Sequence, residues 1–327
     1  MPEPSLVIVS PALADANNGN WRTASRWAQL LAPTHRVRIV RHWPDGDDAA
    51  GDAAMLALHA RRSADAVANW AKAHPGRGLA VVLTGTDLYE DILHDGPARH
   101  SLQRAQRLVV LQDLGVQALP PQHRHKARIV FQSAPAVPPA DKPRQLLRAL
   151  MVGHLRAAKA PQTLFEAARR LRDRDDIRIE HVGAASEPVL GEQARATAEA
   201  CPGYAWLGAL PHEEVLRRIR EAHVLVHTSA LEGGANVIIE AVRSGTPVLA
   251  SRVPGNVGLL GAGYVGCFPP GDAAALAQLL VDCRAGQAAA GGLLDRLRVQ
   301  CAARAPLFDP AAEREALLRL LAELDQG

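Results

Sequence analysis

The sequence has few aromatic residues, little net charge and no long apolar run, and two of these shortages exclude a class of protein. Aromatic residues make up only 4% of the 327 residues, from which no function follows. The formal net charge of +3 is too small for the electrostatic footprint of a protein that binds nucleic acid. No stretch reaches the ~18 consecutive apolar residues that a membrane-spanning helix needs, so we expect no membrane span.

Cysteine is also scarce, and the four cysteines are widely separated. They are Cys201, Cys267, Cys283 and Cys301. None forms a Cys-x-x-Cys pair, and no histidine lies near them in the spacing of a zinc site. We therefore expect reduced, mostly buried thiols and no metal site. The chain enters an apolar run at Leu6–Ser10 without a basic leader, which indicates a cytoplasmic protein.

The length and the hydrophobic content of 48% permit two domains, each with its own core. In residues 1–140, short β-branched runs alternate with amphipathic stretches, which predicts a parallel, doubly wound α/β sheet. The strand candidates are Leu6–Ser10, Arg36–Val40, Leu79–Thr84, Arg107–Leu111 and Arg128–Gln132. The residues around His59 are predicted to belong to a long helical segment.

A proline-rich segment, Pro135–Pro143, interrupts this alternation and predicts a linker, because proline suits neither a helix interior nor a central strand. The predicted domains are residues 1–140 and 141–310. The second domain repeats the pattern, with strand candidates at Arg148–Val152, Ile177–Val182, Ala205–Leu207, His223–Thr228, Pro247–Ser251 and Val265–Phe268. An amphipathic helix is expected over Ala311–Leu324.

The most informative segment contains two carboxylates around a glycine turn. Glu232 precedes Gly233, Gly234 and Ala235, and a helix-forming run starts near Asn236 and carries Glu240. A glycine turn that leads into a helix leaves backbone N–H groups free at the positive end of the helix dipole, which suits a phosphate group. Taken singly, Glu232 can simply end a strand and Glu240 can be a solvated helix residue. Together they predict a pocket for a ligand with phosphate and hydroxyl groups.

A second candidate phosphate element follows the first strand of the second domain. Gly153 opens a turn that carries His154, Arg156 and Lys159. Fixed cations beside a pyrophosphate stabilise the charge that develops on a leaving oxygen. Lysine occurs only at positions 72, 126, 142 and 159, so a lysine in this turn is informative. For Arg156, a plain surface position remains the alternative.

In the first domain, two polar turns follow strand candidates. Gly19, Asn20, Arg22 and Thr23 lie just before a helical run and form a candidate anion nest, with a plain helix cap as the alternative. In doubly wound sheets, ligands bind at the carboxyl ends of the strands, where this turn is expected.

The second polar turn contains Thr86 and Asp87, which are candidate substrate-binding residues. Asp87 can also be no more than a helix cap.

These motifs resemble the Glu-x7-Glu signature of the GT-B glycosyltransferases, and of glycosyltransferase family 4 in particular. The resemblance implies two Rossmann-like domains that face an interdomain cleft, and a C-terminal helix over residues 311–327 that returns to the first domain. It implies that Glu232 lies beside the donor sugar, that residues 233–236 offer N–H groups to sugar and diphosphate, and that Glu240 holds the ribose. It also makes His59 a candidate neighbour of the transferred sugar.

The lysine turn resembles the family's Gly-Arg-Leu-x-x-x-Lys motif. Gly153 and Lys159 keep its spacing, His154 stands where arginine is usual, and Arg156 is the candidate for the missing charge. The resemblance thus implies that Lys159, Glu232 and Arg156 are the catalytic residues. The two Asp-x-Asp sequences, at residues 45–47 and 173–175, fall in polar stretches, so we expect neither a metal ion nor another cofactor.

The chain as a whole resembles a compact branch of this family, the selenosugar synthases of selenoneine biosynthesis. The resemblance rests on residues 18–24, on the strand end at 83–89 and on the two motifs above. It implies a UDP-sugar donor such as UDP-GlcNAc, the small anion selenophosphate as acceptor, and release of UDP. Two alternatives stay open: a family-4 transferase with an alcohol acceptor on a glycan or lipid, and a noncatalytic nucleotide-sugar sensor. The sequence leaves the oligomeric state open.

Overall fold

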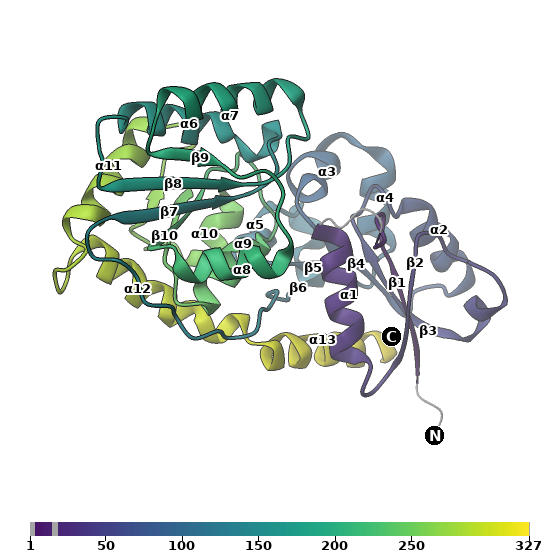
Figure 1. Ribbon diagram of the computed structural model, residues 1–327. Coiled ribbons are helices and arrows are strands. Elements are labelled where there is room, and N and C mark those ends of the chain that lie inside the picture. The colour runs from purple at the N-terminus through teal and green to yellow at the C-terminus, as the bar shows by residue number, and fades with distance from the viewer. Residues whose placement is uncertain (1–3, 15–18, 327) are drawn as a thin grey trace. The chain divides into compact units, whose positions relative to one another are not determined.

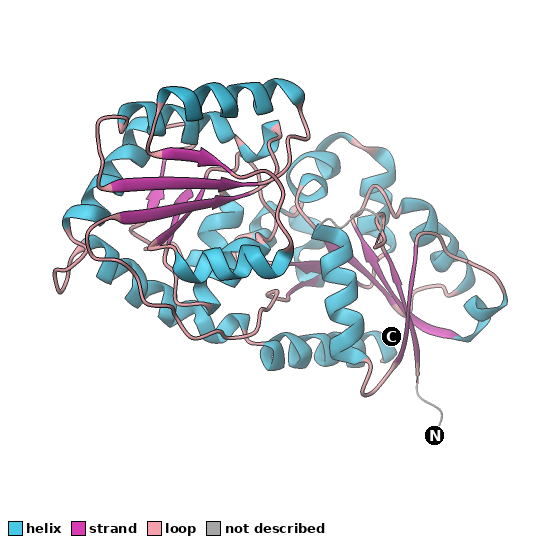
Figure 2. Cartoon of the chain, in the orientation of Figure 1, coloured by secondary structure: helices cyan, strands magenta, loops and turns pink. Residues whose placement is uncertain are grey.

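The computed structural model describes residues 4–14 and 19–326, and the chain divides into two compact α/β units (Figure 1). Unit 1 comprises Met1–Ser133 with Pro310–Gly327, and unit 2 comprises Ala134–Asp309. The division falls just before the proline-rich segment, whereas the sequence placed it at residue 140. Residues 134–143 form neither helix nor strand. The α/β class is confirmed: each unit has one parallel sheet with helices on both faces (Figure 2).

In unit 1 the six strands are all parallel, in the order β2-β1-β3-β4-β5-β6. Their bounds are β1 Ser5–Val9, β2 Arg36–Val40, β3 Asp52–Leu58, β4 Leu79–Leu83, β5 Arg107–Val110 and β6 Ala127–Ile129. Strands β1, β3 and β4 are buried almost throughout, which explains why they are continuous apolar runs.

Two layers of helices cover the unit 1 sheet. On one face, α1 (Gly19–Leu31) and α13 (Pro310–Asp325) bury Trp27 and Leu317 in a common core. On the other face, α2 (Ala64–Ala73) and α4 (Gly96–Arg104) bury Trp70 and Leu102. The short helices are α3 (Ile92–His94) and α5 (Gly115–Ala118), and a π-helix covers Asp87–Asp91.

A buried carboxylate, Glu313 on α13, attaches the end of the chain to unit 1. It accepts hydrogen bonds from Trp27 Nε1 (2.6 Å), Arg26 Nε (2.9 Å) and the Ser133 backbone N–H (2.9 Å). The helix predicted over residues 311–324 is present as α13. Buried Glu313 and the buried leucines of this helix pack on unit 1.

The prediction of a long helix around His59 was wrong, because strand β3 occupies residues 52–58 and His59 follows it directly. The β3 sequence, Asp-Ala-Ala-Met-Leu-Ala-Leu, is rich in residues that favour helices. Its burial between β1 and β4 overrides that preference, and parallel pairing to both neighbours completes its backbone hydrogen bonds.

Unit 2 also has six parallel strands, in the order β12-β11-β10-β7-β8-β9. The bounds are β7 Leu147–Val152, β8 Ile177–Val182, β9 Tyr204–Trp206, β10 Val224–His227, β11 Val248–Ser251 and β12 Cys267–Phe268. All six agree with the strand candidates within a few residues.

Seven α-helices of the described chain surround the unit 2 sheet, as Figure 1 shows in outline. Helices α6 (Pro161–Arg170), α7 (Pro188–Ala200) and α11 (Ala273–Ala285) pack side by side on one face. Helices α8 (His212–Glu221), α9 (Asn236–Arg243), α10 (Pro254–Leu260) and α12 (Leu293–Arg304) complete the unit.

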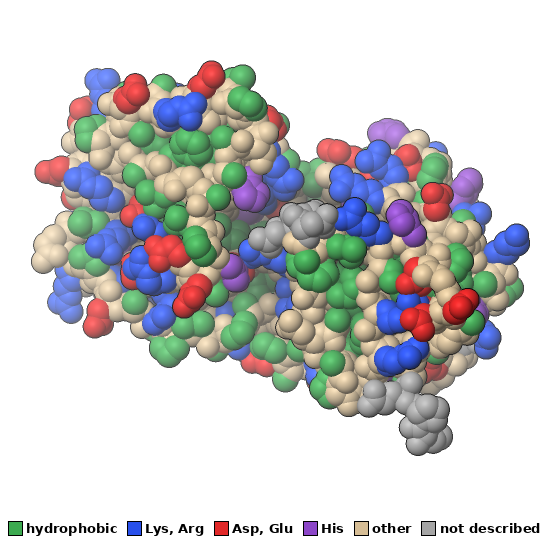
Figure 3. All heavy atoms as spheres, turned by 45° about the vertical axis from the view of Figure 1, so that its right-hand side comes forward, with side chains coloured by type: hydrophobic (Ala, Val, Ile, Leu, Met, Phe, Trp, Pro, Cys, Tyr) green, Lys and Arg blue, Asp and Glu red, His purple; other side chains and the backbone are tan. Residues whose placement is uncertain are grey.

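On the molecular face drawn in Figure 3, acidic and basic side chains are interspersed on each unit. Within the described residues, no helix combines the length and the apolar character needed to cross a bilayer.

Candidate functional site

The strand order of unit 2 defines where a ligand is expected. From β7 the chain adds β8 and β9 on one side of the sheet and then returns to add β10, β11 and β12 on the other. The reversal lies between β7 and β10, and ligands of open α/β sheets bind at the carboxyl ends of the strands at such a reversal. The loop after β7 carries Gly153 and Lys159, and the loop after β10 carries Glu232. The two motifs found in the sequence therefore meet at this point.

Hydrogen bonds hold these two loops together. Thr228 Oγ1 donates to the carbonyl oxygen of Lys159 at 2.7 Å, and the Ala230 N–H donates to the carbonyl of Ala158 at 3.0 Å. Ala160 adopts a left-handed conformation, with φ 44°, and ends the turn where α6 begins. Lys159 is thus presented from a fixed backbone.

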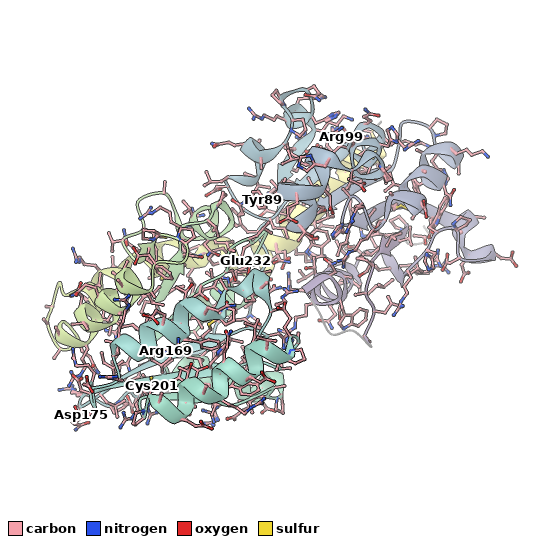
Figure 4. All side chains as sticks on the ribbon, turned by 90° about the horizontal axis from the view of Figure 1, so that it is seen from above. Tyr89, Arg99, Arg169, Asp175, Cys201 and Glu232 are labelled. Atoms are coloured by element: carbon pink, nitrogen blue, oxygen red, sulfur yellow. The ribbon has the colours of Figure 1, made fainter. Side chains whose placement is uncertain are left out.

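The ammonium group of Lys159 forms an ion pair with Oε1 of Glu232. His227, the last residue of β10, places Nε2 3.1 Å from the same oxygen. Exposure of the side chains is 16% for Lys159, 11% for Glu232 and 1% for His227. Lys159 and Glu232 are therefore reached by solvent, whereas the imidazole of His227 is buried. Figure 4 marks the position of Glu232.

Burial and charge act in opposite directions on this group of three. Burial raises the pKa of the Glu232 carboxyl, but the charge of Lys159 and the hydrogen bond with His227 outweigh burial and hold that pKa well below its usual range. Burial lowers the pKa of His227, and the neighbouring Glu232 offsets this only in part. The favoured state is an ionised glutamate with a neutral histidine that donates from Nε2.

The glycine turn after Glu232 leads into α9 as the sequence predicts. Within the described chain, the backbone N–H groups of Gly233 and Gly234 have no hydrogen-bond acceptor, whereas the Ile238 N–H already bonds to Ala235 O at 3.0 Å. Asn236 begins the helix and Glu240 lies one turn later, with Oε1 3.5 Å from Nε2 of His212. These features give the site N–H donors before the start of α9 and a carboxylate one turn into that helix.

A close backbone contact with Gly255 fixes the position of the Glu232 loop. A Cβ atom on Gly255, in the first turn of α10, would lie 1.9 Å from the carbonyl oxygen of Glu232. Only glycine permits this approach of two backbones.

The rest of the β7 loop is partly open to solvent, although Leu155 within it is buried. The N–H of Gly153 bonds to Val182 O at 2.9 Å and continues the sheet by one residue. His154 accepts a hydrogen bond from the Ala184 N–H at its Nδ1 (3.1 Å), so its ring is tied to the neighbouring strand end. Arg156 is exposed.

In unit 1, the predicted anion nest lies at the start of α1. Asp15–Asn18 of the same loop fall outside the described residues. Gly19, Asn20 and Arg22 form the first turn of the helix. Thr23 is buried, and its hydroxyl donates to Gly19 O at 2.9 Å and accepts from Gln132 Nε2 at 2.6 Å. The Thr23 hydroxyl is therefore engaged within unit 1.

His59 directly follows β3, which borders the strand-order reversal of unit 1, and Asp87 lies in the turn after the neighbouring strand β4. His59 has a positive φ of 73° and is 2% exposed, and its Nε2 lies 3.2 Å from the hydroxyl of Thr86. Burial lowers the pKa of His59, against the opposing charge of Asp87. Strained, buried residues at strand ends are typical of functional sites.

The carboxylate of Asp87 organises this corner. Oδ1 accepts the N–H groups of Thr84 (2.8 Å) and Gly85 (2.9 Å), and Oδ2 accepts that of Ala60 (2.9 Å). Asp87 is fully buried. It holds the turns that carry His59 and Thr86 in position, which is more than the helix cap considered from sequence.

Sequence reasoning missed His227 and Gly255. A histidine that ends an apolar strand ordinarily fills the core, and nothing in its spacing reveals the contact with Glu232. Gly255 follows a proline in a run that predicts only a turn. Among the described residues, no group of three or more His, Cys, Asp or Glu side chains is arranged to hold a metal ion.

Residues 147–284 match the family model described as "Glycosyl transferases group 1". The matched residues lie within unit 2 and include the Lys159 and Glu232 loops.

Solved structures resemble the whole chain. Sucrose-phosphate synthase from Thermosynechococcus elongatus is 19% identical, with a TM-score of 0.74 over 98% of this chain and 99% of that one. HepE from Anabaena, solved with UDP and glucose, is 15% identical, with a TM-score of 0.72 over 98% and 100%. TarM from S. aureus is 12% identical, with a TM-score of 0.62 over 82% of this chain, and the aligned chain spans only 55% of TarM. These likenesses show the GT-B fold.

Proposed function

We propose that the chain is a glycosyltransferase that takes the sugar of a UDP-sugar, UDP-GlcNAc in the first instance, and transfers it to selenophosphate. The observation that carries the first half is the meeting of Lys159, Glu232 and the Gly233–Gly234 turn at the strand-order reversal of unit 2. A cation and free N–H groups suit a diphosphate, and a carboxylate suits sugar hydroxyls.

In this proposal the donor diphosphate binds Lys159 and the N–H groups at the start of α9, with Arg156 as an outer cation. Glu232 positions the sugar and Glu240 holds the ribose. In this proposal the acceptor is bound by the candidate residues of unit 1, which include Asn20, Arg22 and His59. The proposed reaction needs no metal ion, because lysine and helix N–H groups neutralise the leaving diphosphate.

The chemistry of selenophosphate suits a site without a strong base. Its selenium attacks the anomeric carbon, the carbon–selenium bond forms, and the bond from that carbon to the diphosphate oxygen breaks. UDP leaves with the electron pair of the broken bond. An anionic selenium nucleophile does not have to lose a proton in this step, unlike an alcohol. The resemblance of the whole chain to selenosugar synthases supports this acceptor.

The test is to incubate the purified protein with UDP-GlcNAc and, separately, selenophosphate, thiophosphate, phosphate or a simple alcohol, with and without EDTA. UDP release is followed, and the products are identified by mass spectrometry. We expect a selenium-containing sugar, formed equally well in EDTA. Release of UDP only with alcohols would favour the ordinary family-4 transferase, and binding of UDP-GlcNAc without transfer or hydrolysis would favour the sensor.

A further inference from the structure

We propose that His227 is a positioning residue that keeps Glu232 fixed and ionised when Lys159 transfers its ion pair from that carboxylate to the diphosphate of the ligand. This inference rests on the proposed function and names a role for a residue that does not touch the ligand. Lys159 is paired with Glu232 in the structure, and the proposed function gives the same ammonium group a second partner, the diphosphate.

Both donors converge on one oxygen of the carboxylate. Lys159 Nζ and His227 Nε2 each approach Oε1 of Glu232. Within the described chain, Oε2 has no hydrogen-bond donor, and the side chain retains 11% exposure. Oε1 is thus the anchored oxygen, and Oε2 is the one left for a ligand hydroxyl.

The charges explain why a second donor is needed. A mostly buried carboxylate that has no hydrogen-bond donor and no cation beside it is strongly disfavoured, so it gains a proton or moves. When the ammonium of Lys159 turns to the diphosphate, the hydrogen bond from His227 remains. Among the residues that the structure describes, Lys159 and His227 are the titratable groups that act on Glu232, so the imidazole then holds the carboxylate without the lysine.

The position of His227 suits a fixed support. It ends β10, a fully buried strand, and it is 1% exposed, so neither its backbone nor its ring has room to follow the ligand. Burial favours the neutral ring. A neutral imidazole that donates from Nε2 can hold the carboxylate without competing with Lys159 for the negative charge of the diphosphate.

The experiment compares His227→Gln with His227→Asn. The amide nitrogen of glutamine reaches about as far as Nε2, whereas that of asparagine reaches only as far as Nδ1. We expect His227→Asn to lower kcat/KM for the UDP-sugar about 10- to 100-fold, the range for a lost hydrogen bond to a charged group. His227→Gln is expected to restore most of it.

The pH profile separates positioning from a loss of folding. Without the hydrogen bond from His227 the pKa of Glu232 in the ligand complex rises, so the acid limb of kcat, which reports that complex, should move to higher pH in His227→Asn and not in His227→Gln. His223→Gln is the matched control, because His223 is a buried histidine at the other end of β10, where it contacts the Arg148 N–H and Pro143 O. Its acid limb should stay where the wild type has it.

The two failures are distinguishable. If the wild type transfers sugar but His227→Asn keeps the wild-type rate and pH profile, the role of His227 is wrong and the proposed function stands. If the wild type transfers nothing, the proposed function is wrong. In that case urea unfolding of the His227→Asn and Glu232→Gln single and double variants still tests the contact, and additive losses of stability would refute it.

Discussion

Replacement of Lys159 by methionine should separate catalysis from folding, because the lysine serves both. Methionine keeps the unbranched side chain up to the position of Cε and removes the charged ammonium group. The variant lacks the cation for the leaving diphosphate, and removal of one such group usually costs ~10²–10³ in rate, or about 3–4 kcal/mol of transition-state stabilisation.

The same change weakens the fold. Glu232 is 11% exposed and keeps only its hydrogen bond from His227 when Lys159 is absent. A fully buried carboxylate that loses its partner costs about 3–5 kcal/mol. Because both side chains of this pair keep some contact with water, we expect a smaller loss, about 1–3 kcal/mol.

A second substitution distinguishes the two effects. In the Lys159→Met, Glu232→Gln double variant no unpaired charge remains, so urea unfolding should recover part of the lost stability, while turnover stays at the level of the single variant or lower. Lys72→Met, at an exposed lysine of α2, serves as the control for the substitution itself. Wild-type turnover of Lys159→Met, measured as UDP release, would refute the reasoning.

Two further predictions test the loop geometry and the surface charges. Gly255→Ala should shift the Glu232 loop, because the added Cβ would lie 1.9 Å from the Glu232 carbonyl oxygen, so turnover should fall sharply. Gly263→Ala is the control, because nothing lies within 4 Å of its added Cβ, and it should keep wild-type turnover. A hydrogen bond from Arg128 lowers the pKa of Glu323 from 4.5 to about 2, so its contribution to stability is present above pH 4.5 and lost as the pH falls through 2. Glu323→Gln should therefore be less stable than the wild type at pH 7 and equally stable near pH 2, as measured by urea unfolding, and an equal difference at both pH values would contradict this.

Much of the fold can be predicted from the sequence because most of its strands are short runs of apolar, often β-branched residues. The β-branched runs of β1, β2, β4 and β5 and all six strands of unit 2 match the candidates. Strand β3 is the exception, since its alanine, methionine and leucine favour a helix and only the central position in the sheet makes it a strand.

The candidate site can be predicted less completely. The Glu232 and Lys159 motifs are local, so their spacing carries the information. Their meeting depends on the order of the strands, which no local pattern specifies. The contact of His227 with Glu232 depends on how the loop after β10 turns back, and that of Gly255 on the approach of a later helix. The sequence made Asp87 a candidate binding residue or a cap, but its bonds to the Ala60 and Thr84 turns depend on the sheet.

A crystal structure of the chain grown with UDP tests the central claim most directly. The account predicts the diphosphate within about 2.7–3.2 Å of Lys159 Nζ and of the N–H groups at the Gly233–Gly234 turn. It predicts that Glu232 is then held by His227 alone. Diphosphate bound elsewhere on the chain, with Lys159 still paired to Glu232, would contradict it.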